Sequence, residues 1–360
     1  MKKLFLYTAA ALTLTACSST DVIDEGAQSS AIGFNTLVGK NSRALTNTNF
    51  TKFYVYGSYT KPGAELTPFQ VFHGEAVTKT DGSWGYDDKR YWVPGASYKF
   101  FAYSCDGNAI NGDNGSVAYP LATSDSYTGP AQVLNINNYI CNNGHQHDLV
   151  YAAAVGNPIL GLETGNRNVS FNFKHILSRV NVKFTSNFTD DYKIAITNVH
   201  IVNMRDKGNY AWSDPTTVSW VKSSVDRTAA DKFISLDIEA DKNIAINGQT
   251  EEEKVRTAYG YVIPFEYAEN NVRLEFDITL YKQSGARDNE LRESDIQVLQ
   301  RHLKGTWAPK WEEGYSYTYN VLLDGTAASL EPIVFETAED MNLDNWTSGT
   351  TQVDFNFSGN

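Results

Sequence analysis

The feature of this sequence that most constrains its fold is a repeated alternation of apolar and polar residues with a period of two. Successive side chains of a β-strand point to opposite faces of a sheet, so this alternation predicts strands that are buried on one side. The predicted strands cover residues 31–38, 52–59, 70–77, 98–104, 149–152, 168–173, 179–184, 193–202, 232–238, 256–264, 272–282, 315–323 and 332–336. Alternating Val353, Phe355 and Phe357 predict a terminal strand at 352–358.

Composition supports an all-β fold, because aromatic residues favour strands and make up 13% of the chain. Many short strands separated by turns are typical of β-sandwiches, and 360 residues are enough for two cores. We place a domain boundary near residue 175, where a turn-rich half gives way to a new series of strands, which predicts domains at 31–175 and 176–360. Residues 106–129 are predicted to form a surface loop, and 287–300 is the one helix-like segment.

The N-terminus has the pattern of an exported lipoprotein. Two lysines precede an apolar run at 4–14, which is too short to span a bilayer as a mature helix. The run ends in Leu-Thr-Ala-Cys, which resembles the lipobox of bacterial lipoproteins. We therefore expect residues 1–16 to be a signal peptide, signal peptidase II to cut between Ala16 and Cys17, and Cys17 to carry the lipid. Residues 17–30 then form a lipidated flexible tether. An ordinary signal peptide that contains a cysteine is the alternative.

Charge and cysteine content narrow the possible partners. The net charge of −12 leaves no basic stripe to neutralise phosphates, so we expect no nucleic acid partner. Besides Cys17 the chain has only Cys105 and Cys141, and export makes a disulfide between them possible. Two buried free thiols are the equal alternative. Zinc needs more ligands at tighter spacing than these two cysteines give.

Motifs that carry catalysis or bind cofactors are absent from the sequence. It has no phosphate-binding Walker loop, no GxGxxG after a strand, no HExxH and no GxSxG. We therefore expect no enzyme, cofactor or catalytic residue, although exported hydrolases can carry such groups on loops without a motif. His145 and His147 would share one face of a strand and could meet one cation, but a polar loop before the next strand is the favoured interpretation. His175 is expected to pack or to hydrogen-bond a turn, and the carboxylates at 251–253 to be solvated.

Aromatic residues at 84–92 raise the alternative of a carbohydrate-binding surface. Trp84, Tyr91 and Trp92 could stack on sugars if they were exposed. Trp92 leads into a proline and a glycine, so a structural corner is its favoured role.

Several stretches, taken together and in order, resemble the fimbrillin family of Bacteroidota, especially its Mfa-like branch. They are YWVPG at 91–95 with YKFFAY at 98–103, DLVYA at 148–152, FNFKHILSRV at 171–180, and WEEGYSYTYNVLL at 311–323, with Trp346 after another apolar strand. The resemblance implies two transthyretin-like β-sandwich domains in tandem and a role as a shaft, tip or accessory subunit of a lipoprotein-derived fimbrium that serves adhesion. Acidic residues soon after Cys17 resemble a surface-export tether, which implies the outer membrane.

In this family the resemblance implies assembly by strand exchange. An arginine-specific surface protease cuts the lipid-anchored precursor, its first strand leaves, and a strand of another fimbrial subunit fills the groove. The Ser-Arg-Ala step at 42–44 resembles the processing site, so Arg43–Ala44 is the candidate bond and Val353, Phe355 and Phe357 belong to the candidate donor strand. An ordinary loop arginine is the alternative for Arg43, and Lys40 is another basic site. A surface glycan-binding lipoprotein beside an outer-membrane uptake system is the second hypothesis for function.

Overall fold

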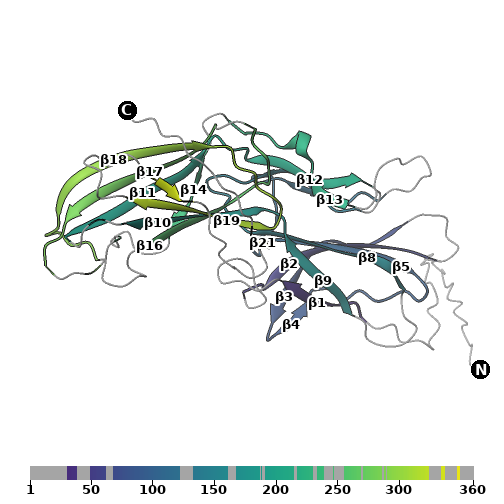
Figure 1. Ribbon diagram of the computed structural model, residues 1–360. Helices are drawn as coiled ribbons and strands as arrows, with labels where there is room; N and C mark the ends of the chain where they lie inside the picture. The colour runs from purple at the N-terminus through teal and green to yellow at the C-terminus, as the bar shows by residue number, and fades with distance from the viewer. Residues whose placement is uncertain are drawn as a thin grey trace, which may run out of the picture.

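The structure is a computed structural model of the chain, and it describes residues 31–38, 49–61, 68–121, 133–160, 168–186, 188, 191–214, 217–229, 233–238, 246, 255–268, 271–285, 288, 290–323, 334–336 and 347–348. These residues form an elongated molecule of twisted sheets (Figure 1). The one helix among them is the 3-10 helix η1 (Lys222–Ser224), and no helix in these ranges is long and apolar enough to cross a membrane. The prediction of an all-β fold is confirmed.

The first half of the chain is built on a seven-stranded sheet. Its strands lie in the order β1-β9-β8-β5-β2-β3-β4. Their bounds are β1 (Gly33–Val38), β2 (Lys52–Thr60), β3 (Phe69–Thr80), β4 (Ser83–Gly85), β5 (Ser97–Cys105), β8 (Leu149–Leu160) and β9 (Asn168–His175). The sheet curls so that its two end strands share one core, in which Phe34 of β1 lies 5.5 Å from Phe72 of β3 between ring centroids.

The central strands of this sheet are covered on both faces. In β5, Phe100 and Ala102 belong to the core inside the curl, whereas Phe101 and Tyr103 face a second core on the other side. Strands that are buried on both faces carry continuous apolar runs rather than alternation. This explains the uninterrupted burial of residues 100–105.

A four-stranded sheet covers the outer face of the seven-stranded sheet. It has the order β13-β12-β7-β6, with bounds β6 (Ser116–Ala118), β7 (Asn135–Ile140), β12 (Lys207–Asp214) and β13 (Thr217–Trp220). Residues 207–220 thus leave the second half of the chain and pair with β7 of the first half. The predicted domain ranges 31–175 and 176–360 remain a prediction from the sequence. Strands β12 and β13 come from the second range but belong to a sheet with β6 and β7 of the first.

The second half of the chain forms two further sheets around one core. The first has the order β15-β16-β10-β19-β20, with β21 also on β19, and the second has the order β14-β11-β17-β18. The bounds are β10 (Ser178–Ser186), β11 (Tyr192–Val202), β14 (Phe233–Ser235), β15 (Asp237–Ile238), β16 (Val255–Val262), β17 (Val272–Lys282), β18 (Ile296–Trp307), β19 (Tyr315–Leu323), β20 (Val334–Glu336) and β21 (Thr347–Ser348). Phe184 of β10 and Phe276 of β17 meet edge to face between the sheets, with ring centroids 4.9 Å apart.

The helix-like pattern at 287–300 is wrong as a prediction. Residues 296–300 begin strand β18, and the described residues 288 and 290–295 are not helical. Ile296 and Val298 are exposed on one face of β18, while Leu299 on the other face packs on the core. The pairing of β18 with β17 also shifts its register between Leu280 and Tyr281.

Candidate functional site

The first strand pairs with β9, and the two residues before it bond to the segment that follows β4. On one side β1 pairs in parallel with β9, from Gly33 opposite Asn168 to Val38 opposite Phe173. On the other side residues 86–91 close the gap, because the Ile32 N–H donates to the Arg90 carbonyl at 2.8 Å. β1 lies in the space between β9 and β4 in Figure 1. We use the name β1 seat for the groups that contact β1 and Ile32. They are strand β9, residues 86–91, and the aromatic rings around Phe34.

The Tyr86 hydroxyl fastens β1 to the second edge. It donates to the Ile32 carbonyl oxygen at 2.8 Å. Burial raises the pKa of Tyr86, so the hydroxyl stays protonated and remains a donor at neutral pH. The Tyr86 hydroxyl oxygen also accepts the Arg90 N–H at 3.2 Å, which holds Tyr86 and Arg90 together.

Phe34 fills the aromatic part of the β1 seat. It is 4% exposed, and in the described structure it contacts the rings of Phe53, Phe72, Tyr86, Phe100 and Phe171. Ile32, two residues earlier on the same face, is 1% exposed. β1 therefore supplies part of the core of the first half through one alternating pair of apolar side chains.

The predicted processing and anchoring residues cannot be placed beside this seat. Cys17, Ala16, Arg43 and Ala44 lie outside the described residues, as does the candidate donor strand with Val353, Phe355 and Phe357. The chain is described again from Asn49, and Phe50 is 1% exposed in the same core as Phe34.

One histidine and one aspartate from two of the family-like stretches meet at the junction between the halves. His175, at the end of β9, lies with its Nδ1 2.9 Å from Asp148 Oδ1, and both residues are buried. The guanidinium of Arg179 lies over the Tyr259 ring at 4.7 Å. The prediction that His175 packs and makes a hydrogen bond is confirmed.

Cys105 and Cys141 are free, buried thiols in the structure. The Cys141 thiol donates to the Tyr261 carbonyl at 3.2 Å, and Cys105 Sγ lies 3.6 Å from the Tyr139 hydroxyl. Burial raises the pKa of Cys105 to about 12 and raises that of Cys141 as well. Both thiols therefore stay protonated at neutral pH and are poor nucleophiles.

The histidine pair at 145–147 belongs to a loop that docks on strand β16. Gln146 makes the contact: its Oε1 accepts the Tyr261 N–H at 2.7 Å, and its Nε2 donates to the Tyr261 carbonyl at 3.2 Å. His147 lies 3.8 Å from a carboxylate oxygen of Asp106. The favoured loop interpretation is confirmed, and the described residues contain no cluster of three or more potential metal ligands. The carboxylates at 251–253 lie outside the described residues.

The aromatic residues at 84–92 do not form an exposed platform. Trp92 is 2% exposed and packs edge to face on Tyr98 at 4.8 Å, and Gly95 has a φ of 71°, as the turn at 94–95 requires. Trp84 packs against Phe53, and only Tyr91 of the three is exposed. The predicted corner is confirmed.

Sequence reasoning missed the contribution of residues 86–91 to the β1 seat. Tyr86 lies in the turn-rich stretch that follows β4, where no alternating pattern marks it as buried. The other wall was visible, because Phe171 and Phe173 alternate in the predicted strand at 168–173. Which two edges meet at β1 depends on long-range pairing, and the sequence pattern carries no signal for it.

Comparisons with known proteins agree with this architecture. A family model described as fimbrillin-like matches residues 42–338. A fimbrial protein from Bacteroides vulgatus ATCC 8482 has a similar fold, with a TM-score of 0.54, 18% identity, and coverage of 88% of this chain and 99% of that chain.

Two more distant solved structures were also found. The fimbrial anchor protein Mfa2 from Porphyromonas gingivalis has a TM-score of 0.31, 12% identity, and coverage of 86% of this chain and 97% of that chain. A fimbrial assembly protein from Parabacteroides distasonis has a TM-score of 0.36, 12% identity, and coverage of 91% and 100%. A comparison with curated proteins found no match. Because the family model spans most of the chain, the resemblance seen in the sequence is confirmed, and the chain belongs to the fimbrillin-like family.

Proposed function

We propose that this protein is a structural subunit of a cell-surface fimbrium that serves adhesion. In this proposal it is made as a precursor anchored in the outer membrane through a lipid on Cys17, and it is assembled by exchange of its first strand. Membership of the fimbrillin-like family supports the fimbrial role. The observation that supports the assembly step is that β1 pairs with β9 at the end of the seven-stranded sheet, while Ile32, just before it, bonds to Arg90.

The position of β1 makes it separable from the rest of the fold. Among the described residues, its one ladder is with β9, and it is the first strand in chain order. A cut between Arg43 and Ala44 by an arginine-specific surface protease would leave β1 attached by non-covalent contacts alone. The same cut would separate Cys17 and its lipid from the folded residues that begin at Asn49.

Departure of β1 would leave a strong site for another strand. The edge of β9 would present unpaired N–H and C=O groups, and Phe171 and Phe53 would lose the ring of Phe34. A fully buried Phe is worth about 1.5–3 kcal/mol relative to exposure, so a vacant seat favours any strand with matching apolar side chains.

The C-terminus of a second copy or of a related subunit has the required pattern. Ile32 and Phe34 enter the core with a spacing of two residues, and Val353, Phe355 and Phe357 repeat that spacing. A strand given by each subunit to the next makes a head-to-tail contact that does not close, so it grows into a filament.

Processing of the purified precursor tests the proposal. Graded treatment with an arginine-specific protease, followed by mass spectrometry and size-exclusion chromatography, should give one early cut after Arg43, loss of the fragment with β1, and ladders of oligomers. Arg43→Ala should stay uncut at this position and monomeric, while the matched control Lys40→Ala is processed normally. Early cutting of Arg43→Ala at the same rate as wild type, or cleaved wild type that keeps β1 and remains monomeric, would refute the proposal.

Deletion of residues 352–360 separates folding from growth. The shortened chain should fold and be cut after Arg43, but it should form no ladder by itself. If the shortened chain fails to fold, the terminal strand belongs to the subunit's own sheet, and the donor assignment is wrong.

A further inference from the structure

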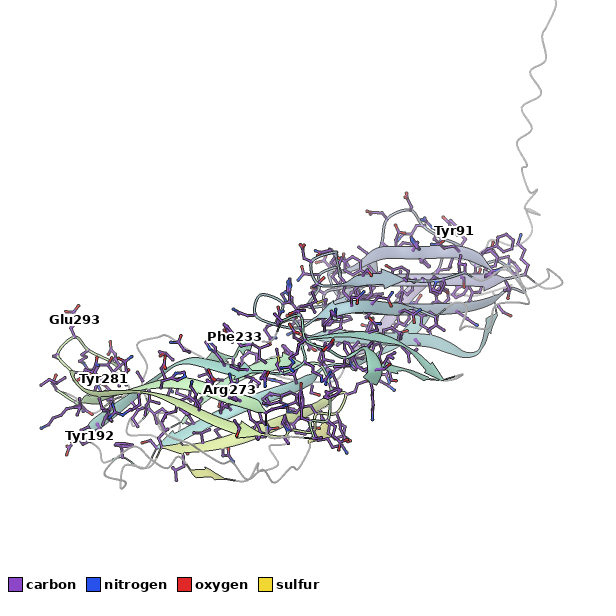
Figure 2. All side chains as sticks on the ribbon, turned by 90° about the horizontal axis from the view of Figure 1, so that it is seen from above. Tyr91, Tyr192, Phe233, Arg273, Tyr281 and Glu293 are labelled. Atoms are coloured by element: carbon purple, nitrogen blue, oxygen red, sulfur yellow. The ribbon has the colours of Figure 1, made fainter. Side chains whose placement is uncertain are left out.

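A cavity of about 360 Å³ is lined by residues of the second half of the chain, beside its junction with the first half. Its walls come from the connection between β11 and β12, from the loop after η1, and from the residues that follow β16. Phe265 forms one wall and packs against the hydrophobic cores of both halves. Arg273, two residues beyond the wall residue Asn271, is labelled near the middle of the molecule in Figure 2. Small-molecule sites favour such junctions, and this volume lies in their range.

Arg205 is fixed on the aromatic wall of the cavity. Its guanidinium lies over the Phe265 ring at 4.5 Å and donates to the Val225 carbonyl at 2.8 Å. Its backbone N–H donates to the Tyr267 hydroxyl at 2.7 Å. Because that hydroxyl accepts the N–H, its own proton can be donated to a ligand. The side chain of Arg205 is 37% exposed, so part of it remains accessible to a ligand.

Arg227 also lines the cavity, and hydrogen bonds fix the loop to which it belongs. Asp206, which is fully buried, accepts the Thr228 N–H at 2.7 Å and the Thr228 hydroxyl at 2.6 Å. Arg227 donates to the side-chain oxygen of Asn203, and the amide of Asn203 donates to the Asn271 carbonyl at 2.7 Å. Asn203 has a φ of 68°, in the left-handed region. The polar groups of this wall are therefore placed before any ligand arrives.

The chemistry of the lining selects for an anion with hydrogen-bonding groups. The lining includes the side chains of two arginines, Arg205 and Arg227, and of one acidic residue, Glu266, in a chain whose net charge is −12. Asp226 lies 3.8 Å from Arg205 but is 71% exposed. The positive excess thus suits one negative charge rather than two. The Asn203 and Asn271 amides and the Tyr267 hydroxyl suit hydroxyl or amide groups beside that charge.

We propose that this cavity binds a carboxylate-bearing sugar residue of an acidic glycan, with Arg205 and Arg227 contacting the carboxylate. The ring of the sugar lies against the wall of Phe265 and Tyr267. Uronic acids and sialic acids share this chemistry. The site is independent of strand exchange, because none of its residues contacts β1.

Direct titration of the purified, unprocessed protein tests this site. Calorimetry or saturation-transfer NMR with galacturonate and with the methyl glycoside of N-acetylneuraminate should show binding of at least one of them, with a Kd of about 1 mM or tighter. Galactose, which lacks the carboxylate, and acetate, which lacks the sugar, should each bind at least about tenfold more weakly. The acid that binds more tightly identifies the source.

Arg227→Ala should weaken the binding of that acid at least about tenfold, because it removes one of the two charged forks. Lys222→Ala is the matched control, since Lys222 is an exposed cation on η1 that does not line the cavity. Arg227→Gln serves if the alanine variant loses its folded circular dichroism spectrum. The proposal is overturned if neither acid binds, if acetate binds equally well, or if both Arg227 variants bind like wild type. Arg227→Ala should still be cut and form ladders, so failure of this site is distinguishable from failure of strand exchange.

Discussion

Single residues from distant motifs meet at the junction of the two halves. Asp148 precedes β8 and His175 ends β9, yet their side chains are 2.9 Å apart and buried. The sequence could predict that His175 packs near a turn, because a break in the alternation follows it. It could not identify Asp148 as the partner, because a pairing across 27 positions depends on the register of two strands.

Glu313 places a carboxyl at the same junction. Its Oε1 accepts the Tyr210 hydroxyl at 2.9 Å, which links the turn before β19 to β12 of the four-stranded sheet. Burial raises the pKa of Glu313 from its ordinary value of 4.5 to about 7. The folded protein therefore holds a proton between these pH values that the unfolded chain releases. This contribution stabilises the fold at low pH and is lost as the pH rises through about 5–7.

Glu313→Gln should therefore be more stable than wild type at pH 8, by about 2–3 kcal/mol, because the amide keeps the bond from Tyr210 without a buried charge. The difference in free energy of unfolding should fall towards zero at pH 5. Urea unfolding at both pH values measures it. Glu312→Gln is the control, because Glu312 is 46% exposed and pairs with Lys310 at the surface, so it should show a small difference at both pH values. A difference for Glu313→Gln that does not depend on pH would contradict the raised pKa.

Among the elements, β1 is the strand whose removal the proposed assembly requires. Phe34→Ala should lower the free energy of unfolding of the precursor by about 3–5 kcal/mol, because it leaves a cavity among several aromatic rings. Once the precursor has been cut and polymerised, β1 is gone, and the variant polymer should be as stable as the wild-type polymer. Thermal unfolding of the precursor and of the polymer gives the comparison.

Asn35→Ala is the matched control for this prediction. Asn35 is exposed on the opposite face of β1, and its side chain accepts one hydrogen bond from Asn168 at 3.1 Å. The change should cost about 0.5 kcal/mol or less in the precursor. A polymer that is weakened by Phe34→Ala as much as the precursor would show that β1 is retained.

Most strands could be predicted, and the failures have identifiable physical causes. The prediction of a helix at 287–300 failed because polar groups of this segment bind the ammonium of a lysine that is distant in sequence. Lys193 of β11 is fully buried, and its ammonium donates to the Glu290 carbonyl at 2.5 Å and lies 3.2 Å from Asp295. Tyr192, Tyr281 and Glu293 mark this end of the molecule in Figure 2. A turn that encloses a buried lysine from another strand has no local signature.

Two missed strands show a related limit. β7 has the sequence NINNYI and β12 has KGNYAWSD, and both carry residues such as Asn, Gly and Asp that are depleted in strands. They pair with each other and cover the outer face of the seven-stranded sheet. Tertiary packing adds to their stability, with Tyr139 of β7 fully buried and Tyr210 of β12 nearly so.

At the scale of the whole molecule, the sequence predicts the class of fold but not the order of the sheets. The two predicted halves share a core, because Tyr261 of β16 and Ile263, just after it, pack with Tyr103 and Tyr151 of the first half. The closed position of β1 between β9 and residues 86–91 likewise emerges only from the assembled sheet. The β1 seat and the cavity lined by Arg205 and Arg227 are therefore properties of the tertiary structure.

The central claim is that β1 leaves its seat and a terminal strand of a neighbouring copy replaces it. Hydrogen–deuterium exchange of the intact precursor and of the processed polymer tests this most directly. We predict that the amides of Asn168–His175 in β9 stay protected in both, that the fragment carrying β1 is absent from the polymer, and that residues 352–358 become protected only on polymerisation. A polymer that retains the β1 fragment, or in which 352–358 exchange as fast as in the precursor, would contradict the account.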